Sequence, residues 1–490
     1  MTPPISQSLN SRKVAERVFV KARLTLKTPA HFGNGDGGAL TDIPLLRDAL
    51  TGRPLLTGAS IAGALRNYLR EYKHGYGTGE NKIGDTLAEK LFGYVHEEKD
   101  REENDASYES WFFVDDALGT PPDKDHAVEL RDGVAINAVT RTAERSEKGK
   151  GYLFDIELLS AGTTFDLGFE LWLTESNRDE LLEGLAIALH GLTSGAIRLG
   201  MRKRRGYGEC AAKITEISRY NMSDPKHVVA WLERRPVGGE LPQPSGKHIG
   251  ESFVMEAHFR LAKDSSLLIR SETGSGNSPD MVHLRSWRGN EAKPILSGTS
   301  LTGVLRSRAL RIAKTKKEPA AAEEFINEMF GKRIKPNGKD KPTGSLLIVN
   351  ETEIEPAQAI VDRVQSRVKI DRFTGGAYPT GLFSQQPVFG NHHTEIHMRL
   401  ELRKTPKTET QFHAQIGLLL FVLKDLWTED LPIGGESSVG RGRLTGQFTR
   451  LSLGDKTWEI TADGSNLIFG GNGTPAELEA FGQAFAGGVK

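Results

Sequence analysis

Hydrophobic and polar positions follow the same succession twice along the chain. Apolar and polar residues alternate over residues 18–26, and they alternate again over residues 253–261. A period of two is typical of a strand with one buried face. The alternation returns later in each half, over residues 165–171 and 396–402. We therefore expect matching half-buried strands in the two halves.

A helical period follows the first strand of each half. Apolar residues recur three and four positions apart after Thr57 and again after Ser297. Hydroxyl side chains accept hydrogen bonds from the free N–H groups of a first turn. We therefore expect Thr57 or Ser60 to cap the first helix, and Ser300 or Thr299 to cap the second. The apolar stripe of the first helix comprises Ile61, Leu65, Tyr68, Leu69 and Tyr72.

The remaining elements recur in the same order. A helix ending in Leu-Phe-Gly at residues 91–93 matches one ending in Met-Phe-Gly at residues 329–331. Long amphipathic helices are expected over residues 178–192 and 408–427. Strand, helix, strands, helix, strand is the order of a ferredoxin-like domain. The pattern predicts an α+β protein with two copies of that domain and inserted loops.

Two motifs make the duplication plain. TGASIAGALR at residues 57–66 returns as SGTSLTGVLR at residues 297–306. The glycine-rich loop LGMRKRRGYGE at residues 199–209 returns as IGGESSVGRGR at residues 433–443. Internal repeats in a fixed order indicate repeated structural units.

The domain limits follow from composition. Residues 234–250 are rich in proline and glycine, which is typical of an interdomain linker. We therefore predict a first module over residues 1–233 and a second over residues 251–490.

Composition narrows the functional class. The chain has 490 residues, with 64 Lys and Arg against 64 Asp and Glu, so a nucleic-acid binder would have to gather its positive charge on one surface. Cys210 is the only cysteine, which excludes an internal disulfide. No signal peptide or membrane-spanning apolar run is present. These features favour a cytoplasmic protein.

Acidic residues accompany the glycine-rich stretch after each first strand. The first stretch is followed or interrupted by Asp36, Asp42 and Asp48, and the second carries Asp280 alone. Backbone N–H groups without side chains can approach phosphates, and a neighbouring carboxylate could bind a divalent cation. A turn-forming aspartate is the simpler explanation for any one of them.

The two glycine-rich loops differ in charge. The second has Glu436, Ser437 and Ser438 where the first has three successive cations. Arginine clusters beside an aromatic residue favour phosphate contacts and base stacking. The two copies should therefore hold nucleic acid with unequal strength. The first loop contributes Arg202, Lys203, Arg204, Arg205 and Tyr207.

Two further features leave alternatives open. Gly63 and Gly303 lie one turn into their helices, where glycine costs about 1 kcal/mol against alanine. Close packing on a sheet or the close approach of a phosphate backbone would explain them equally well. His393, Glu395 and His397 would share a strand face and could ligate a metal, but the first half has no counterpart, which argues against such a site.

In combination, these features resemble the RAMP superfamily of CRISPR-associated proteins, and most of all the backbone subunit of type III effector complexes. The resemblance rests on the loop with aspartate, PLLTGASIAGALR, LFG, VKIDRFTGGA with LFS downstream, and the terminal G-x-G loop. It covers nearly the whole chain, once per half. Two modules in one polypeptide are similar to the fused double-backbone subunit of type III-D variants.

The resemblance implies RRM-like cores that hold a guide CRISPR RNA and β-hairpin thumbs that push between nucleotides of the guide–target duplex. It also implies a loop aspartate that cuts target RNA with a divalent cation, for which Mg²⁺ is the expected ion. Catalytic and metal-binding roles then fall on Asp42 and Asp280, with Asp36 ranked below them. The expected partners are the guide, the target RNA and other type III subunits.

The same resemblance assigns the remaining site residues. Copy two keeps more of the family's thumb pattern than copy one, which has Asn137 and Ala138 where copy two has Asp371 and Arg372. The expected thumb residues are Asn137, Thr140, Arg141, Asp371, Phe373 and Thr374. The expected RNA-binding residues are Ser60, Arg66, Arg202, Lys203, Arg204, Arg205, Tyr207, Ser300, Arg306, Arg372 and Arg441.

Three rival functions remain. A scaffold that grips guide RNA and never cuts is plausible, above all for copy two. A guide-precursor processing endonuclease would need a catalytic histidine near the first helix; His31 and His74 are available, but copy two has no counterpart at either. A duplicated metabolic enzyme is disfavoured because no P-loop or Rossmann fingerprint is present.

Overall fold

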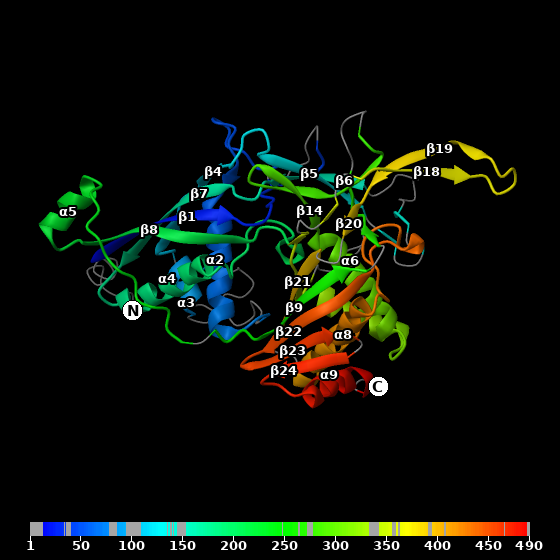
Figure 1. The fold of residues 1–490 in the computed structure, drawn as a ribbon. Coiled ribbons are helices and arrows are strands. Elements are labelled where there is room, and N and C mark those ends of the chain that lie inside the picture. Colours follow the sequence, from blue (N-terminus) through cyan, green and yellow to red (C-terminus); the bar gives the residue numbers. More distant parts are fainter. Residues whose placement is uncertain are drawn as a thin grey trace.

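In the computed structural model, the first strand of each half lies inside its own sheet and pairs with a strand on either side (Figure 1). All structural statements below concern the described part of the chain. The described residues are 13–33, 35, 41–77, 86–94, 109–134, 136–137, 140, 142–144, 153–246, 248–262, 265–271, 278–332, 343–354, 359–360, 363–390, 394–405, 408–464 and 466–487.

The first half forms a sheet in the order β2-β4-β7-β1-β8, with β3 also paired to β7. Helices α2 and α4 pack together beside this sheet, and α3 packs on α4. The strands are β1 (Glu16–Leu26), β2 (Leu55–Leu56), β3 (Phe112–Val114), β4 (Ala117–Thr120), β7 (Thr164–Leu173) and β8 (Cys210–Asn221). The helices are α2 (Gly58–His74), α3 (Leu87–Phe92), α4 (Arg178–Thr193) and α5 (Pro225–Leu232).

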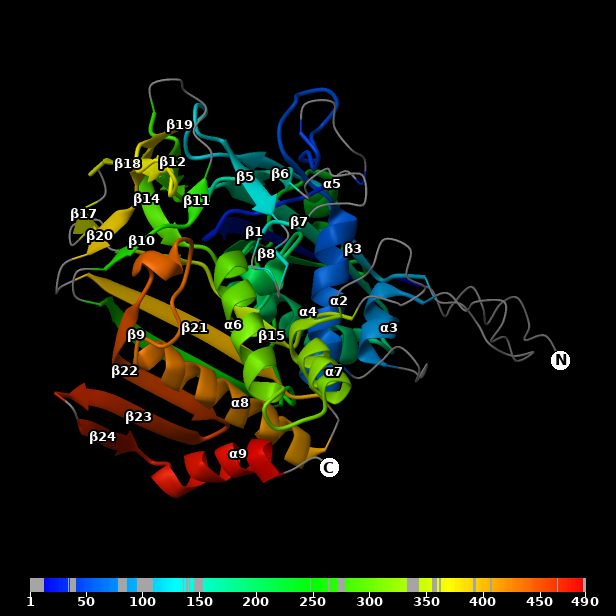
Figure 2. The ribbon, with the colours of Figure 1, turned by 90° about the vertical axis from the view of Figure 1, so that its right-hand side faces the viewer.

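The second half forms a sheet in the order β15-β21-β9-β22-β23-β24. Figure 2 shows the last two strands and α9 as an extension at the edge of this sheet. The strands are β9 (Ser252–Leu261), β15 (Leu347–Val349), β21 (Glu395–Arg403), β22 (Leu444–Leu453), β23 (Lys456–Asp463) and β24 (Asn466–Gly471). The helices are α6 (Gly298–Ala313), α7 (Pro319–Phe330), α8 (Glu409–Trp427) and α9 (Pro475–Gly487).

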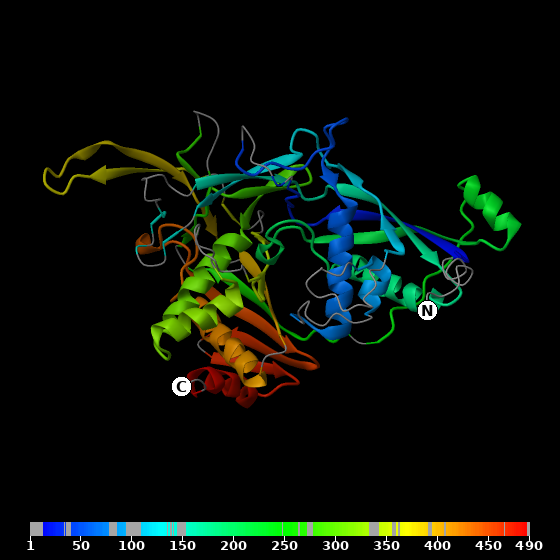
Figure 3. The same ribbon diagram turned by 180° about the vertical axis from the view of Figure 1, so that it is seen from behind.

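Hairpins and short strands lie above the two sheets. In the first half, β5 (Val128–Val134) pairs with β6 (Leu153–Leu159). In the second, β18 (Gln365–Ile370) and β19 (Ala377–Gln386) form a long hairpin that projects from the body at the end opposite α5 (Figures 1 and 3). The shorter strands are β10 (Ser266–Leu267), β11 (Arg270–Ser271), β12 (Met281–His283), β13 (Arg285–Arg288), β14 (Glu291–Leu296), β16 (Thr352–Glu353), β17 (Ala359–Ile360) and β20 (Val388–Gly390).

Hydrophobic periodicity explains these elements. Alternate residues of β1 and β9 are buried, as their period of two predicts. The whole apolar stripe of α2 is buried. Thr57 caps α2 as expected, but Ser297 caps α6, so the expectation of Ser300 or Thr299 is wrong. The cap lies three residues before Ser300, whose amide it binds.

Each half buries its own hydrophobic core. One cluster of buried residues extends from Val18 to Ala212 and the other from Phe253 to Phe485, with no residue in common. The protein is therefore a mixed α+β fold of mostly antiparallel sheets. Within the described residues, no helix combines the length and apolar character needed to cross a bilayer.

Candidate nucleic-acid interface

A cleft of about 820 Å³ in the first half gathers several of the predicted residues. One wall is the segment after β1, the second is the start of α2, and the third is the glycine-rich loop after α4. Asp42, Ser60 and Lys203 all line it, although they are far apart in the sequence. A carboxylate, a helix N-terminus and a cation therefore share one cavity.

Gly63 also lines this cleft, and the structure decides between its two explanations. Among the described residues, a Cβ atom built on Gly63 or on Gly303 would meet no atom within 4 Å. Close packing on a sheet is therefore wrong for both glycines. The bare backbone of Gly63 faces open space beside the start of α2, where free N–H groups favour a phosphate.

The carboxylate of Asp42 lies at the root of the first hairpin. Its Oδ2 accepts a hydrogen bond from the Asp155 amide in β6, at 3.1 Å. Asp155 lies opposite Asp132 of β5. Partial desolvation and then the neighbouring carboxylates of Asp132 and Asp42 raise the pKa of Asp155. Three carboxylates therefore place negative charge around the root of the first hairpin.

Asp280 has the same backbone partner but different neighbours. Its Oδ2 accepts hydrogen bonds from the Ser384 amide at 2.7 Å and the Ser384 hydroxyl at 3.0 Å. These bonds lower the pKa of Asp280. Ser384 lies opposite Ser366 in the second hairpin, as Asp155 lies opposite Asp132 in the first. Serines thus occupy the two positions that hold carboxylates in copy one, so Asp280 has less negative charge beside it at these positions.

The glycine-rich loops repeat in atomic detail. Arg202 and Glu436 both adopt the left-handed conformation, with φ of 54° and 59°. Each begins a single 3-10 turn, Lys203–Arg205 or Ser437–Val439, which ends at a left-handed glycine. Uncommon backbone angles at matching positions show that the loop conformation is held by its surroundings and not by its side chains.

The cations of the first loop are crowded together. Lys203 and Arg205 are exposed, and Arg202 lies 4.8 Å over the ring of Phe154. Arg204 donates a hydrogen bond to the carbonyl of Ser345 in the second half. Partial desolvation lowers the pKa of all four side chains, and their charges are more effective toward an anion when water is partly excluded.

Burial of the side chain argues against two of the predicted RNA contacts. Tyr207 is 3% exposed, packs on Ile156 and Leu158, and cannot stack on a base. Arg441 is also 3% exposed. Its guanidinium donates hydrogen bonds to Glu436 of the loop, Gln385 of the hairpin and Ser266 of β10, so it stabilises the scaffold.

The remaining predicted contacts lie at or near the helix starts. Ser60 and Ser300 hydrogen-bond their cap residues, at 2.9 Å and 3.0 Å between oxygens. Arg306 donates to the Gly331 carbonyl at 2.8 Å and so also fixes the end of α7. Arg66 is half-buried on α2. Their contacts with RNA stay predictions.

The turn of the second hairpin presents an aromatic side chain to solvent. Phe373 is 100% exposed at the tip, beside exposed Arg372. Asp371 accepts hydrogen bonds from the Phe373 amide at 3.0 Å and the Thr374 hydroxyl at 3.1 Å. These bonds shape the turn, and the projecting hairpin has the form of a wedge (Figure 3).

The first hairpin is described only in part. The Asn137 side chain accepts a hydrogen bond from the Thr140 amide at 3.0 Å. Arg141 and Ala138 lie outside the described residues, as does Asp36. Their predicted roles stay untested.

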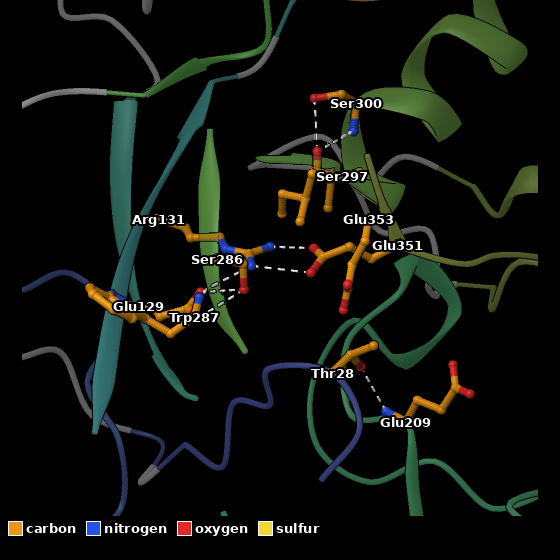
Figure 4. A network of polar contacts seen from close by, with 12 residues as sticks. Thr28, Glu129, Arg131, Glu209, Ser286, Trp287, Ser297, Ser300, Glu351 and Glu353 are labelled. Atoms are coloured by element: carbon orange, nitrogen blue, oxygen red, sulfur yellow. Dashed lines mark hydrogen bonds and ion pairs between the residues drawn. The ribbon is translucent and has the colours of Figure 1, made fainter. Parts of the chain in front are cut away.

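The root of the first hairpin is bound to the second half by buried charges (Figure 4). Arg131 of β5 forms ion pairs with Glu351, and its own neighbour Glu129 accepts a hydrogen bond from the Ser286 hydroxyl at 2.9 Å. All four residues are buried. Burial alone would raise the pKa of Glu351, but Arg131 and Arg288 hold it below its usual value.

The sequence analysis did not predict this network or the acids around Asp42. Asp132 and Arg131 belong to no motif in the sequence. Their roles depend on strand register and on contacts between the halves, neither of which has a local sequence signal. Alternating charges in β5 were the one available hint.

Comparison with protein families identifies a match in each half of the chain. The family model for the RAMP superfamily matches residues 23–211 and residues 266–445. Together these regions cover more than half of the chain, once in each half. The search of curated proteins gives no match.

Proposed function

Because the chain belongs to the RAMP superfamily, we propose that it is a subunit of a CRISPR-associated ribonucleoprotein that holds guide RNA and cleaves target RNA. The observation that carries this proposal is the cleft that brings Asp42 together with the start of α2 and Lys203. Its partners would be the guide CRISPR RNA, the target RNA and further subunits of a type III complex.

Each half would be a ferredoxin-like, RRM-like module. The strand orders β4-β7-β1-β8 and β15-β21-β9-β22 support this assignment, because the first strand of each half is central and the last is its neighbour. Two such modules in one chain support a fused double-backbone subunit of the type III-D kind.

The guide would follow the clefts through its phosphates. Lys203, the bare backbone of Gly63 and the first turn of α2 offer contacts that do not depend on base identity. Base pairing with the guide would then supply the sequence specificity. The protein would recognise the shape and charge of the RNA.

The hairpins would act on the guide–target duplex. Phe373 at the exposed tip is suited to insert between bases, and unstacking costs a few kcal/mol per nucleotide. A splayed nucleotide can align its 2′-hydroxyl with its own phosphate. Asp42 lies at the root of the other hairpin, where its carboxylate could accept the hydroxyl proton.

Asp42 is the residue that would hold Mg²⁺, and the carboxylates of Asp132 and Asp155 would add negative charge nearby. When bound, the ion would neutralise charge on the scissile phosphate. Asp42 is tied to the β6 backbone, and Asp132 faces Asp155 across the hairpin.

The test is the pattern of target fragments from an assembled complex. Asp42→Asn should abolish one cut and leave guide binding nearly unchanged. Asp48→Asn is the matched control, since the Asp48 carboxylate binds Thr51 in a turn and does not line the cleft. An unaltered fragment pattern in Asp42→Asn would contradict the catalytic assignment.

A non-cutting scaffold role is the second candidate for copy two. The hydrogen bonds from Ser384 and the serine at position 366 favour it, because Asp280 has fewer anionic neighbours than Asp42 at these positions. If Asp280 does cut, an Asp280→Asn complex should lose a second fragment boundary. Cleavage that persists at all boundaries in this variant would support the scaffold role.

The processing endonuclease gains little support. His31 does line the cleft, but its side chain is 2% exposed. Its Nδ1 lies 2.8 Å from the Glu157 carbonyl. This contact fixes the ring against β6.

A further inference from the structure

Two histidines and a glutamate meet on the second sheet, away from the cleft. His258 of β9 and His397 of β21 are direct cross-strand neighbours, and Glu395 lies two positions before His397. Their ligand atoms all lie within 4.8 Å of one another. The two imidazole rings stack with centroids 4.0 Å apart and planes 6° apart. The His397 Nε2 lies 3.3 Å from a Glu395 oxygen.

The strands fix this arrangement. All three side chains point away from the buried face of the sheet, because the buried residues of β9 and β21 occupy the alternate positions. The sequence suggested His393 as the third ligand, which lies outside the described residues. The neighbouring strand supplies His258 in its place.

We propose that His258, Glu395 and His397 form a binding site for a Zn²⁺-type cation, with a fourth position open to solvent. Two imidazoles and a carboxylate are an established ligand set for zinc. Mg²⁺ is disfavoured because it prefers oxygen ligands. Zinc–nitrogen bonds of about 2.0–2.1 Å require only a rotation of the stacked rings toward a shared point.

The equivalent position in the first module carries no metal-ligating pair of histidines. The strands β1 and β9 end equivalently, since Leu26 pairs with Cys210 and Leu261 with Leu444 at the start of the last strand. Counting back, Arg23 and Asp166 occupy the cross-strand positions of His258 and His397.

That first-module pair forms an ordinary ion pair. Arg23 Nε lies 2.8 Å from Asp166 Oδ1. An exposed ion pair therefore occupies this point in the first module, and two ligating rings occupy it in the second.

One cation competes with the metal. Arg260 Nη2 lies 3.4 Å from Glu395 Oε1 in an ion pair. A bound cation would have to share the carboxylate with this guanidinium. Removing Arg260 should therefore strengthen metal binding, whereas it would weaken a site that merely needs the ion pair for its fold.

The experiment is a titration of the metal-stripped full chain with Zn²⁺ by calorimetry, followed by Co²⁺ absorption spectroscopy. The unaltered protein should bind one equivalent more than a variant carrying both His258→Arg and His397→Asp, which installs the ion pair of the first module. Arg260→Ala should bind with equal or several-fold higher affinity. Asp48→Asn, a change in a turn outside the cleft, should not change the zinc stoichiometry. No RNA is present in the titration, so the outcome is independent of RNA cleavage.

A second control isolates the role of geometry. His413 also faces a carboxylate, Glu409, at 3.1 Å, but within one helix and without a second histidine. His413→Ala should keep the full zinc stoichiometry. Equal stoichiometry in the unaltered protein and the His258/His397 double variant would overturn the proposal, as would a cobalt spectrum that persists in the double variant.

Discussion

The glycine-rich loops of the two modules share their backbone and differ in their charge. Leu199 donates to the Gly208 carbonyl at 3.0 Å, and Ile433 donates to the Gly442 carbonyl at 2.9 Å. Gly208 and Gly442 are indispensable, because a Cβ atom would lie 1.8 Å from the facing carbonyl oxygen. The side chains between them face outward or fill local gaps. The two copies thus share the glycines that the backbone path requires and differ in the side-chain charges that a ligand would contact.

The aspartates at the hairpin roots give the same lesson. Asp42 and Asp280 accept a hydrogen bond from the same backbone position of their hairpins. Around this shared bond, copy one has further acids and copy two has serines. The comparison therefore separates an anchoring hydrogen bond, present in both copies, from the local negative charge, which is greater in copy one.

The largest expected effect comes from the contact between the modules. Arg131→Ala would leave Glu351 buried with fewer partners and should lower the free energy of unfolding by about 3–5 kcal/mol. Thermal and urea unfolding measure the loss. Adding Glu351→Ala to it should restore part of the stability. Arg23→Ala, which removes an exposed ion pair, should change the melting temperature little.

Exchanging the acids and serines should exchange the metal requirement. With both Asp132→Ser and Asp155→Ser, the Mg²⁺ concentration for half-maximal cleavage at Asp42 should rise about tenfold or more. The reverse change, Ser366→Asp with Ser384→Asp, should lower the requirement at Asp280. Fragment yields at graded Mg²⁺ concentrations test both. If the curves of fragment yield against Mg²⁺ concentration coincide for all variants, the acids and serines do not set the metal requirement.

The loop charges should appear in the salt dependence of guide binding. Lys203→Ala should reduce the slope of log K against log salt by about 1. Ser437→Lys should increase the slope by a similar amount, because it gives copy two the positive charge that Lys203 gives copy one. Lys316→Ala, an exposed change near the far end of α6, is the control and should leave the slope unaltered.

The smallest expected effect is a difference in pH dependence between the hairpin roots. The hydrogen bonds from Ser384 lower the pKa of Asp280 below the ordinary aspartate value of 3.8. Their contribution to stability is therefore fully present at pH values above 3.8, and it is lost as the pH falls through the lowered pKa of the folded protein. The pKa of Asp155 is raised, so its effect on stability has the opposite sign. Protonation of Asp155 as the pH falls through the raised pKa relieves its repulsion with the carboxylates of Asp132 and Asp42. Titration of the carboxyl groups followed by NMR would show both pKa shifts. In the Asp132→Asn variant, the pKa of Asp155 should move back toward 3.8.

Local patterns predicted most of the fold. The alternation of β1, the stripe of α2 and the glycine ends of α3 and α7 all appear in the structure where their periods placed them. The cap at Ser297 was missed because three neighbouring hydroxyl residues compete for one role. Propensity alone does not distinguish among them.

The site was predicted less completely. Asp42, Ser60 and Lys203 do meet in one cleft, but Tyr207 and Arg441 looked like exposed loop residues and are buried. Their burial depends on the hairpin roots packing over the loops, which is a long-range contact. The same kind of contact brings Asp132 and Asp155 to Asp42. Such long-range contacts cannot be predicted from composition or from the spacing of residues.

The contact at Arg131 is unimolecular, since both sides belong to one polypeptide. Tethered surfaces meet at an effective concentration set by the linker, so dilution cannot separate them as it would two free subunits. A polar, ion-paired joint is sufficient under these conditions, because it needs only to orient the modules and not to recruit one to the other. The spacing between Asp42 and Asp280 then becomes a fixed property of the molecule, independent of how much of it the cell makes.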